Sequence, residues 1–334
     1  MRYSRILKQA VRLIGVVIFI YILLGIDIQS MLSFALQIPL VYTLVLVLSV
    51  LPIMIMKGVR WKIIAEGLDL RLSTQEATEA LCMAQLANLV IPGSLGDLIR
   101  VPYMQHRGNQ VDRSIISILL DAIIGSVIPY TVAILALAML LEINISFEAV
   151  LVVSIWLVGG YGFYRILRVT LWSKFMKARL ERLMKDGIRG RTFFTLPSMF
   201  KTIGSRRIAI TLILSAILFT LSASQAYLLA IALKMTIDWT YLAVSLGLTI
   251  MMMAIPVTIQ GLGIREGVLL FMLTRVNLEP TLIVSFSLMF MLINITPALA
   301  GFIMWTKNPF VDITDQEILD AEVVWPPFSN LEKE

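Results

Sequence analysis

Cysteine and histidine are nearly missing from this chain, and each scarcity excludes a kind of site. The 334 residues include one cysteine, Cys82, and one histidine, His106. A single cysteine cannot form an intramolecular disulfide or a CxxC motif, and its simplest role is that of a small buried apolar residue. A single histidine leaves almost nothing for a histidine-based metal site or a Ser-His-Asp triad. We therefore expect no metal and no cofactor.

Charged residues are also scarce. They make up 15% of the chain, whereas hydrophobic residues make up 58% and the mean hydropathy is +0.88. An ordinary globular domain is less apolar than this. A bilayer core of about 30 Å requires roughly 20 apolar residues in a helix, and several uncharged runs reach that length. The composition predicts an all-α fold, a polytopic helical membrane protein.

About seven full spans and two broken segments account for the apolar runs. The spans are expected near residues 11–28, 38–56, 114–141, 148–168, 208–233, 240–257 and 280–303. Two further apolar segments, 76–104 and 259–275, are interrupted by proline and glycine. Non-helical backbone survives at membrane depth only inside protein or beside a wet cavity. These two segments are therefore expected to be broken or re-entrant.

The distribution of positive charge along the chain indicates a membrane protein and not a nucleic-acid-binding protein. The formal charge is +6, but the basic residues lie in short segments between apolar runs, which sets topology and attracts anionic headgroups. The basic segments 57–71 and 165–207 are expected to face the cytoplasm, together with the N-terminus. Short loops and a lone cysteine fit a multi-pass protein of a prokaryotic inner membrane.

One membrane domain, residues 1–306, is expected to form nearly the whole protein. It includes the basic loop 169–207, which is predicted to lie on the cytoplasmic side of the membrane surface. Residues 307–334 are acidic and are expected to form a partly disordered tail. The side on which this tail ends stays open, because 259–275 can either cross the membrane or return. Residues 1–12 are basic and favour a retained first span over a cleaved signal peptide.

The first broken segment carries a pattern of glycine, proline and charge. Its residues of interest are Asn88, Pro92, Gly93, Gly96, Asp97 and Arg100. A helix is expected to end at the proline, and a second helix to start close to the aspartate after a glycine-rich turn. The free N–H groups and the dipole of a helix start favour anions. Asp97 and Arg100 are three residues apart, so they are expected to share a face and to pair.

The second broken segment repeats the pattern with Gln260, Gly261, Gly263, Arg265 and Glu266. Two broken helices in a membrane chain indicate a binding site at mid-depth in transporters. An ionisable group inside a membrane costs at least ~2.5 kcal/mol, so such groups are functional candidates. The alternative is that each acid–base pair only pins its loop to the bundle.

Two weaker candidates lie outside the broken segments. Arg60 and Trp61 are expected at the cytoplasmic end of the second span, where an aromatic ring and a snorkelling cation are ordinary anchors. Asp121 lies eight residues into the third long span. It can serve as a proton relay or bond a neighbouring helix, and the sequence does not decide between these roles.

At these residues the chain resembles the flippase-like transmembrane region of lysylphosphatidylglycerol synthases and their stand-alone relatives. The likeness covers about residues 5–305 and rests on three motifs: Arg60-Trp61, then Asn88 with Pro92-Gly93-x-x-Gly96-Asp97-x-x-Arg100, and Gly261-Leu-Gly263-x-Arg265-Glu266-Gly267. Members often have glutamate at the position of Asp97, and often an arginine at that of Ala122. The resemblance implies a helical domain that translocates lipids. The aminoacyl-transferase domain of full synthases is not expected here, so lipid synthesis by this chain is not expected either, and a separate lipid-synthesising enzyme is a candidate partner.

The leading hypothesis is a lipid translocator that is not an enzyme and that moves an anionic phospholipid or a lipid-linked sugar. In this hypothesis Arg100 and Arg265 bind phosphate, and Asp97 and Glu266 orient these arginines or contact the headgroup. The chain has no GxxxxGK[ST] motif for nucleotide. Two alternatives stay open. One is a membrane-embedded transferase or hydrolase with a carboxylate as general base, and the other is a non-catalytic subunit that recruits a lipid-modifying enzyme.

Overall fold

The computed structural model describes residues 33–34, 36–90, 95–140, 202–254 and 261–307, and the regular structure within these ranges is helical. The helices are α3 (Leu40–Glu66), α4 (Thr74–Val90), η1 (Leu95–Ile99), α5 (Arg100–His106), α6 (Val111–Leu140), α9 (Ser205–Ala232), α10 (Trp239–Met253), α11 (Ile264–Leu273), η3 (Thr274–Val276) and α12 (Pro280–Lys307). The predicted all-helical class is confirmed for the described residues.

Four of the described helices are long and apolar enough to cross a bilayer, namely α3, α6, α9 and α12. Helix α10 is apolar but shorter. Large apolar side chains on the outside of α3 are exposed, among them Leu40, Leu44 and Leu48 at 72%, 52% and 66%. A surface of this kind is suited to lipid and not to water. The chain is a multi-pass helical membrane protein.

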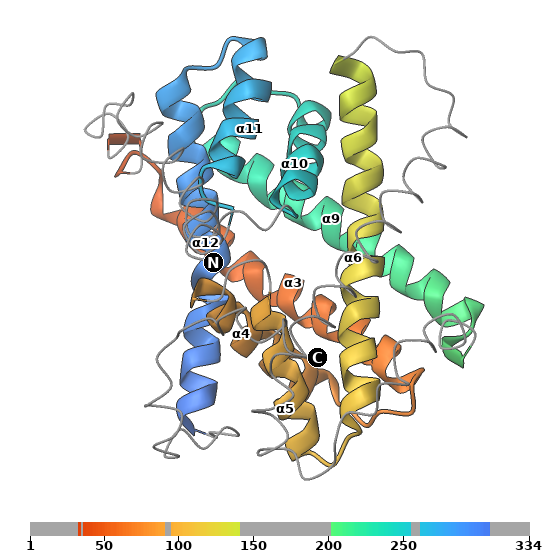
Figure 1. Cartoon of the computed structure of the whole chain (residues 1–334). Helices are drawn as coiled ribbons and strands as arrows, with labels where there is room; N and C mark the ends of the chain where they lie inside the picture. The colour runs from red at the N-terminus through yellow and green to blue at the C-terminus, as the bar shows by residue number, and fades with distance from the viewer. Residues whose placement is uncertain (1–32, 35, 91–94, 141–201, 255–260, 308–334) are drawn as a thin grey trace, which may run out of the picture.

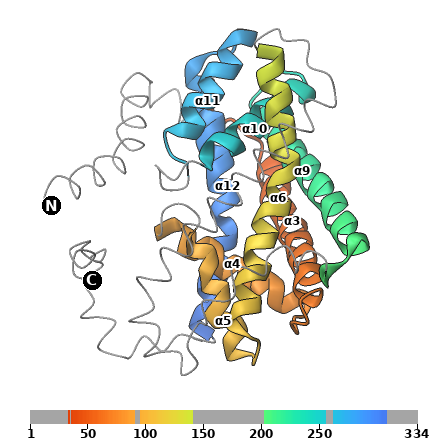
Figure 2. The same cartoon turned by 45° about the vertical axis from the view of Figure 1, so that its right-hand side comes forward.

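The helices that flank the two breaks extend toward opposite ends of the helical bundle. Figures 1 and 2 show α4 and α5 at one end and α10 and α11 at the other, in both views. Helix α4 packs against α12 and α3, and α10 packs against α6 and α11. Asp238 caps the start of α10, and its carboxylate accepts hydrogen bonds from the N–H groups of Tyr241 and Thr240. These bonds hold the pKa of Asp238 below its ordinary value.

Helix α3 departs from the prediction. Its expected end was residue 56, but the helix continues to Glu66. Trp61 is fully buried, and its indole N–H donates to the Ser117 hydroxyl at 3.2 Å. Arg60 bonds Asp121, also on α6. The prediction that Arg60 and Trp61 are interfacial anchors is therefore wrong, because α6 offers both side chains polar partners inside the bundle.

Several expectations concern residues outside the described ranges. These are the spans at 11–28 and 148–168, nearly all of the loop 169–207, the tail from residue 308, and the candidates Pro92, Gly93 and Gln260. The expected spans at 114–141, 208–233 and 280–303 correspond to α6, α9 and α12 within a few residues. The expected span 240–257 corresponds to α10, which ends at Met253.

A glycine allows the close contact between α12 and α4. A Cβ atom added at Gly301 on α12 would overlap the backbone carbonyl of Cys82 on α4. Small residues at such crossings let membrane helices approach closely. Helix α4 carries Asn88 and Gln85, so this contact supports one wall of the cavity described below.

Gly301→Ala is expected to lower the free energy of unfolding by about 1–3 kcal/mol, since the added methyl group forces α12 away from α4. Thermal unfolding of the purified protein in detergent measures the effect. Gly267→Ala is the matched control, because a Cβ at Gly267 meets open space. Equal unfolding temperatures for the two variants would contradict the assigned helix contact.

Candidate functional site

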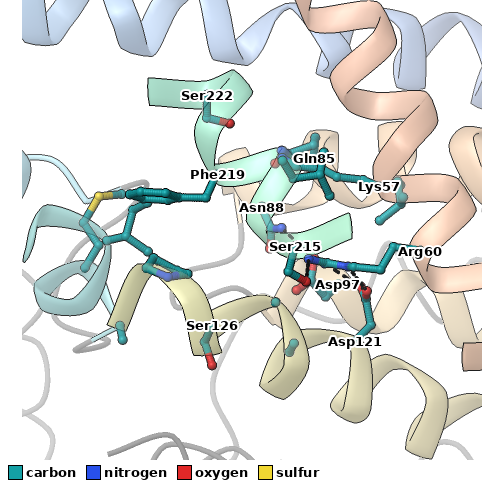
Figure 3. A pocket seen from close by; sticks show the side chains of 18 of the residues that line it. Lys57, Arg60, Gln85, Asn88, Asp97, Asp121, Ser126, Ser215, Phe219 and Ser222 are labelled. Atoms are coloured by element: carbon teal, nitrogen blue, oxygen red, sulfur yellow. Dashed lines mark hydrogen bonds and ion pairs between the residues drawn. The ribbon is translucent and has the colours of Figure 1, made fainter. Parts of the chain in front are cut away.

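A cavity of about 450 Å³ lies between the long helices, and one side of it is polar. Its lining combines charged and polar groups with apolar ones. The charged and polar residues are Lys57, Arg60, Gln85, Asn88, Asp97, Arg100, Asp121, Ser126, Ser215 and Ser222. The apolar residues include Met54, Leu81, Leu218, Phe219, Ile250 and Met253. A cavity of this size falls within the range of small-molecule and headgroup sites. Figure 3 shows its labelled polar side chains.

One carboxylate on α6 joins two arginines from different parts of the chain. Asp121 accepts a hydrogen bond from Arg60 Nε at 2.9 Å through Oδ1 and one from Arg100 Nη1 at 3.2 Å through Oδ2. The Asp121 and Arg100 side chains are 6% and 2% exposed. Arg60 Nη1 also donates to Ser215 on α9 at 3.2 Å. The network thus links α3, α5, α6 and α9 around the cavity.

The 3-10 helix η1, which follows α4, adds a second carboxylate to this network. Asp97 Oδ2 lies 3.8 Å from Arg100 Nη2, so the pairing expected from their spacing is confirmed. Asn88 Nδ2 donates to Asp97 Oδ1 at 3.1 Å. A Cβ at Gly96 would overlap the backbone of Asn88, so the glycine lets η1 lie directly on α4. Arg100 also lies over the ring of Trp61, at 4.7 Å from the centroid, which is a cation–π contact.

Small residues on α6 leave room for the arginine from α3. Gly125 follows Asp121 by one helical turn, and a Cβ at Gly125 would lie 2.8 Å from Arg60 Nη1. Ala122 and Ser126 line the same wall. Because these side chains are short, the guanidinium group of Arg60 can reach Asp121 and the cavity stays open on this side.

The second acid–base pair forms a separate cluster between α11 and α12. Glu266 is fully buried and accepts hydrogen bonds from the Gly263 N–H at 2.7 Å, from Arg265 Nε at 3.0 Å and from the Ser287 hydroxyl at 2.8 Å. Arg265 Nε also donates to Ser287 at 2.9 Å. Gly263 has φ +83° and precedes the first residue of α11. These bonds fix the start of α11 against α12.

The family of the protein follows from a comparison with family models. The model described as lysylphosphatidylglycerol synthase TM region matches residues 9–301. This chain belongs to that family. The family is associated with lipid flipping, and only its membrane region, with no synthase domain, is matched here. No curated protein matches the chain.

The structure brings together, in the lining of the cavity, six of the residues that the family resemblance and the sequence singled out. Asn88, Asp97, Arg100, Arg60 and Asp121 all line the cavity. From the second motif of this lysylphosphatidylglycerol synthase TM region protein, Gly261 reaches the lining, whereas Arg265 and Glu266 are not among the described residues that line it. The Asp97–Arg100 pair therefore lines the cavity, whereas the Arg265–Glu266 pair is not part of the described lining.

Five polar residues of the cavity were not singled out from the sequence as site residues: Lys57, Gln85, Ser126, Ser215 and Ser222. A weak signal existed for some of them. Lys57 precedes Arg60 by three residues, and Ser215 precedes Ser222 by seven, so each pair shares a helix face. Lys57 was counted only as a loop charge, because the span was expected to end before it.

Proposed function

We propose that this protein translocates lipids with an anionic headgroup, either a phospholipid or a lipid-linked sugar, across the inner membrane. The supporting observation is the polar cavity itself, in which Arg60, Arg100, Asp97 and Asp121 are held between apolar helices. Placing these charges in a membrane has a cost of several kcal/mol. A closed ion-pair network satisfies the charges, and the adjoining space admits a polar headgroup.

The proposal includes the topology. About seven full spans and two broken segments form one membrane domain, residues 1–306, and the N-terminus faces the cytoplasm. Supporting this, the cavity lies beside both broken segments, with Asp97 and Arg100 from one and Gly261 from the other. Broken helices beside a central site are typical of membrane transporters.

In this mechanism the headgroup enters the cavity while the acyl or prenyl chains stay in the bilayer. The serines on α6 and α9 and the amides on α4 replace part of the headgroup's hydration. The apolar wall around Phe219 and Met253 gives the chains a surface to follow. No step requires a covalent bond to form.

A different class of function is a membrane-embedded transferase or hydrolase that uses Asp97 or Glu266 as general base. A free carboxylate would favour it. Asp97 instead pairs with Arg100 through Oδ2 and accepts a hydrogen bond from Asn88 through Oδ1, and Glu266 accepts hydrogen bonds from Gly263, Arg265 and Ser287, so neither carboxylate is free. The geometry therefore favours translocation. A third hypothesis is a subunit that recruits a separate lipid-synthesising enzyme. In that case the ion-pair network of Arg60, Arg100, Asp97 and Asp121 would not be needed for function.

Purified protein in liposomes is expected to speed the exchange of fluorescent phospholipids between leaflets, measured by dithionite quenching. Ser222→Trp is expected to abolish this activity, since the indole fills the cavity at α9. Ser224→Trp is the matched control, because Ser224 is on the same helix but exposed. Crossing at the wild-type rate in the Ser222 variant would contradict the cavity route. Recovery of a chemically altered lipid would favour the transferase.

A further inference from the structure

Lys57 differs from the other two cations of the cavity. It lies on α3, one turn before Arg60, and lines the cavity with it. Figure 3 shows both side chains extending from α3 toward the cavity. No hydrogen bond or ion pair joins the Lys57 ammonium group to any residue in the described ranges. A cation held among helices without a direct ion-pair partner is costly, so the ammonium group of Lys57 is available to a ligand.

The two arginines, in contrast to Lys57, have hydrogen-bond and ion-pair partners within the protein. Arg60 directs Nε and Nη2 to Asp121 Oδ1, both at 2.9 Å, and Nη1 to Ser215. Arg100 directs Nε to the Asp97 carbonyl at 3.2 Å and Nη1 to Asp121 Oδ2, and its face covers Trp61. Each guanidinium nitrogen of the two arginines therefore has at least one protein partner. The two arginines therefore form part of the cavity wall, and Lys57 is the cation that is available to bind a ligand.

The charges of the lining set the charge of the ligand. The described lining carries three cationic side chains, Lys57, Arg60 and Arg100, and two carboxylates, Asp97 and Asp121. Each arginine has a carboxylate beside it, so one positive charge is left over, on Lys57. A ligand with one negative charge neutralises the cavity, whereas a diphosphate brings at least one charge without a partner.

We propose that Lys57 binds the phosphate of a lipid phosphodiester headgroup with a single negative charge, and that this contact selects such lipids over diphosphate-linked ones. The inference rests on the proposed translocation and names its substrate class. A phosphodiester oxygen accepts a charge-assisted hydrogen bond from the ammonium group. Gln85 and Ser222 line the same cavity and supply neutral donors for the other headgroup oxygens.

The test compares wild-type protein with Lys57→Gln, Lys57→Met and Lys57→Arg in liposomes. The probes are fluorescent phosphatidylglycerol, phosphatidylcholine and a fluorescent polyprenyl diphosphate. The Gln and Met variants are expected to move phosphatidylglycerol slower by about tenfold or more, the effect of one lost charge-assisted hydrogen bond. The Arg variant retains most of the activity. Lys62→Gln is the matched control, because Lys62 pairs with Glu66 outside the cavity.

Thermal unfolding in detergent checks whether the variants fold and whether the bound phosphodiester belongs to a lipid or to a soluble compound. Removing an unpaired cation should leave the unfolding temperature of Lys57→Gln at or above that of the wild type. Phosphatidylglycerol should raise the unfolding temperature of the wild type and not that of Lys57→Gln. If soluble glycerophosphoglycerol raises it at the same concentration as the lipid does, the ligand is a soluble phosphodiester and the lipid assignment is overturned.

The outcomes separate this inference from the proposed function. If the wild type moves phosphatidylglycerol and both neutral variants match it, the role of Lys57 is overturned and translocation stands. If the polyprenyl diphosphate crosses as fast as phosphatidylglycerol, the selection for a single charge is overturned. If the wild type moves no probe, the proposed function fails, and the inference fails with it.

Discussion

Asp121→Ala is expected to lower the free energy of unfolding by about 3–5 kcal/mol and to abolish lipid translocation. The variant leaves Arg60 and Arg100 without their shared carboxylate, and the Arg100 side chain is only 2% exposed. An unpaired buried charge costs far more than an unpaired surface charge. Chemical or thermal unfolding in detergent measures the stability, and vesicle assays measure the transport.

Asp112→Ala is the control for this prediction, because Asp112 is on the same helix but outside the network. Asp121→Asn should fall between the wild type and the alanine variant, since its single amide oxygen can accept from one arginine well and from the other poorly. A wild-type unfolding midpoint for Asp121→Ala would show that the arginines do not depend on this carboxylate.

Glu266→Ala is expected to destabilise the protein by a similar amount, about 3–5 kcal/mol. Glu266 is fully buried and holds Arg265, Ser287 and the N–H group at the start of α11. Its removal leaves the Arg265 guanidinium buried without a counter-charge and frees α11 from α12. The measurement is again thermal unfolding in detergent, with Glu279→Ala at an exposed position as control.

This variant also separates two interpretations of the second motif. A pair that only fixes α11 loses stability when Glu266 is replaced, and transport falls together with the folded fraction. A pair that binds substrate would lose transport at unchanged unfolding temperature. The hydrogen bonds from Gly263 and Ser287 favour the first interpretation, which was one of the two alternatives that the sequence left open.

Local features of the fold could be predicted from the sequence. Long uncharged runs predicted α9 and α12, because a bilayer requires helices of that length. The spacing of Asp97 and Arg100 predicted their pairing, since neighbours three apart on a helix share a face. Gly96 lies in η1 and directly against Asn88, whereas the glycine-rich turn predicted before it falls on residues outside the described ranges. These results depend on residues close together in the chain.

Contacts between distant residues could not be predicted in the same way. Arg60 and Asp121 are 61 positions apart, and nothing in either helix shows which face meets the other. Helices that are apolar all round have no polar stripe to mark their inner side. The end of α3 was placed too early because the cations from Lys57 onward were interpreted as a basic loop, and Lys57 was therefore not assigned to the cavity.

The central claim is that lipid headgroups pass through the cavity beside Ser222. The direct test uses protein with Cys82→Ala and Ser222→Cys, reconstituted in liposomes and assayed before and after reaction with N-ethylmaleimide. A second preparation carries Ser224→Cys, whose thiol faces outward on the same helix. The account predicts that labelling residue 222 stops phosphatidylglycerol exchange and that labelling residue 224 does not. Unchanged exchange after complete labelling at residue 222 would contradict it.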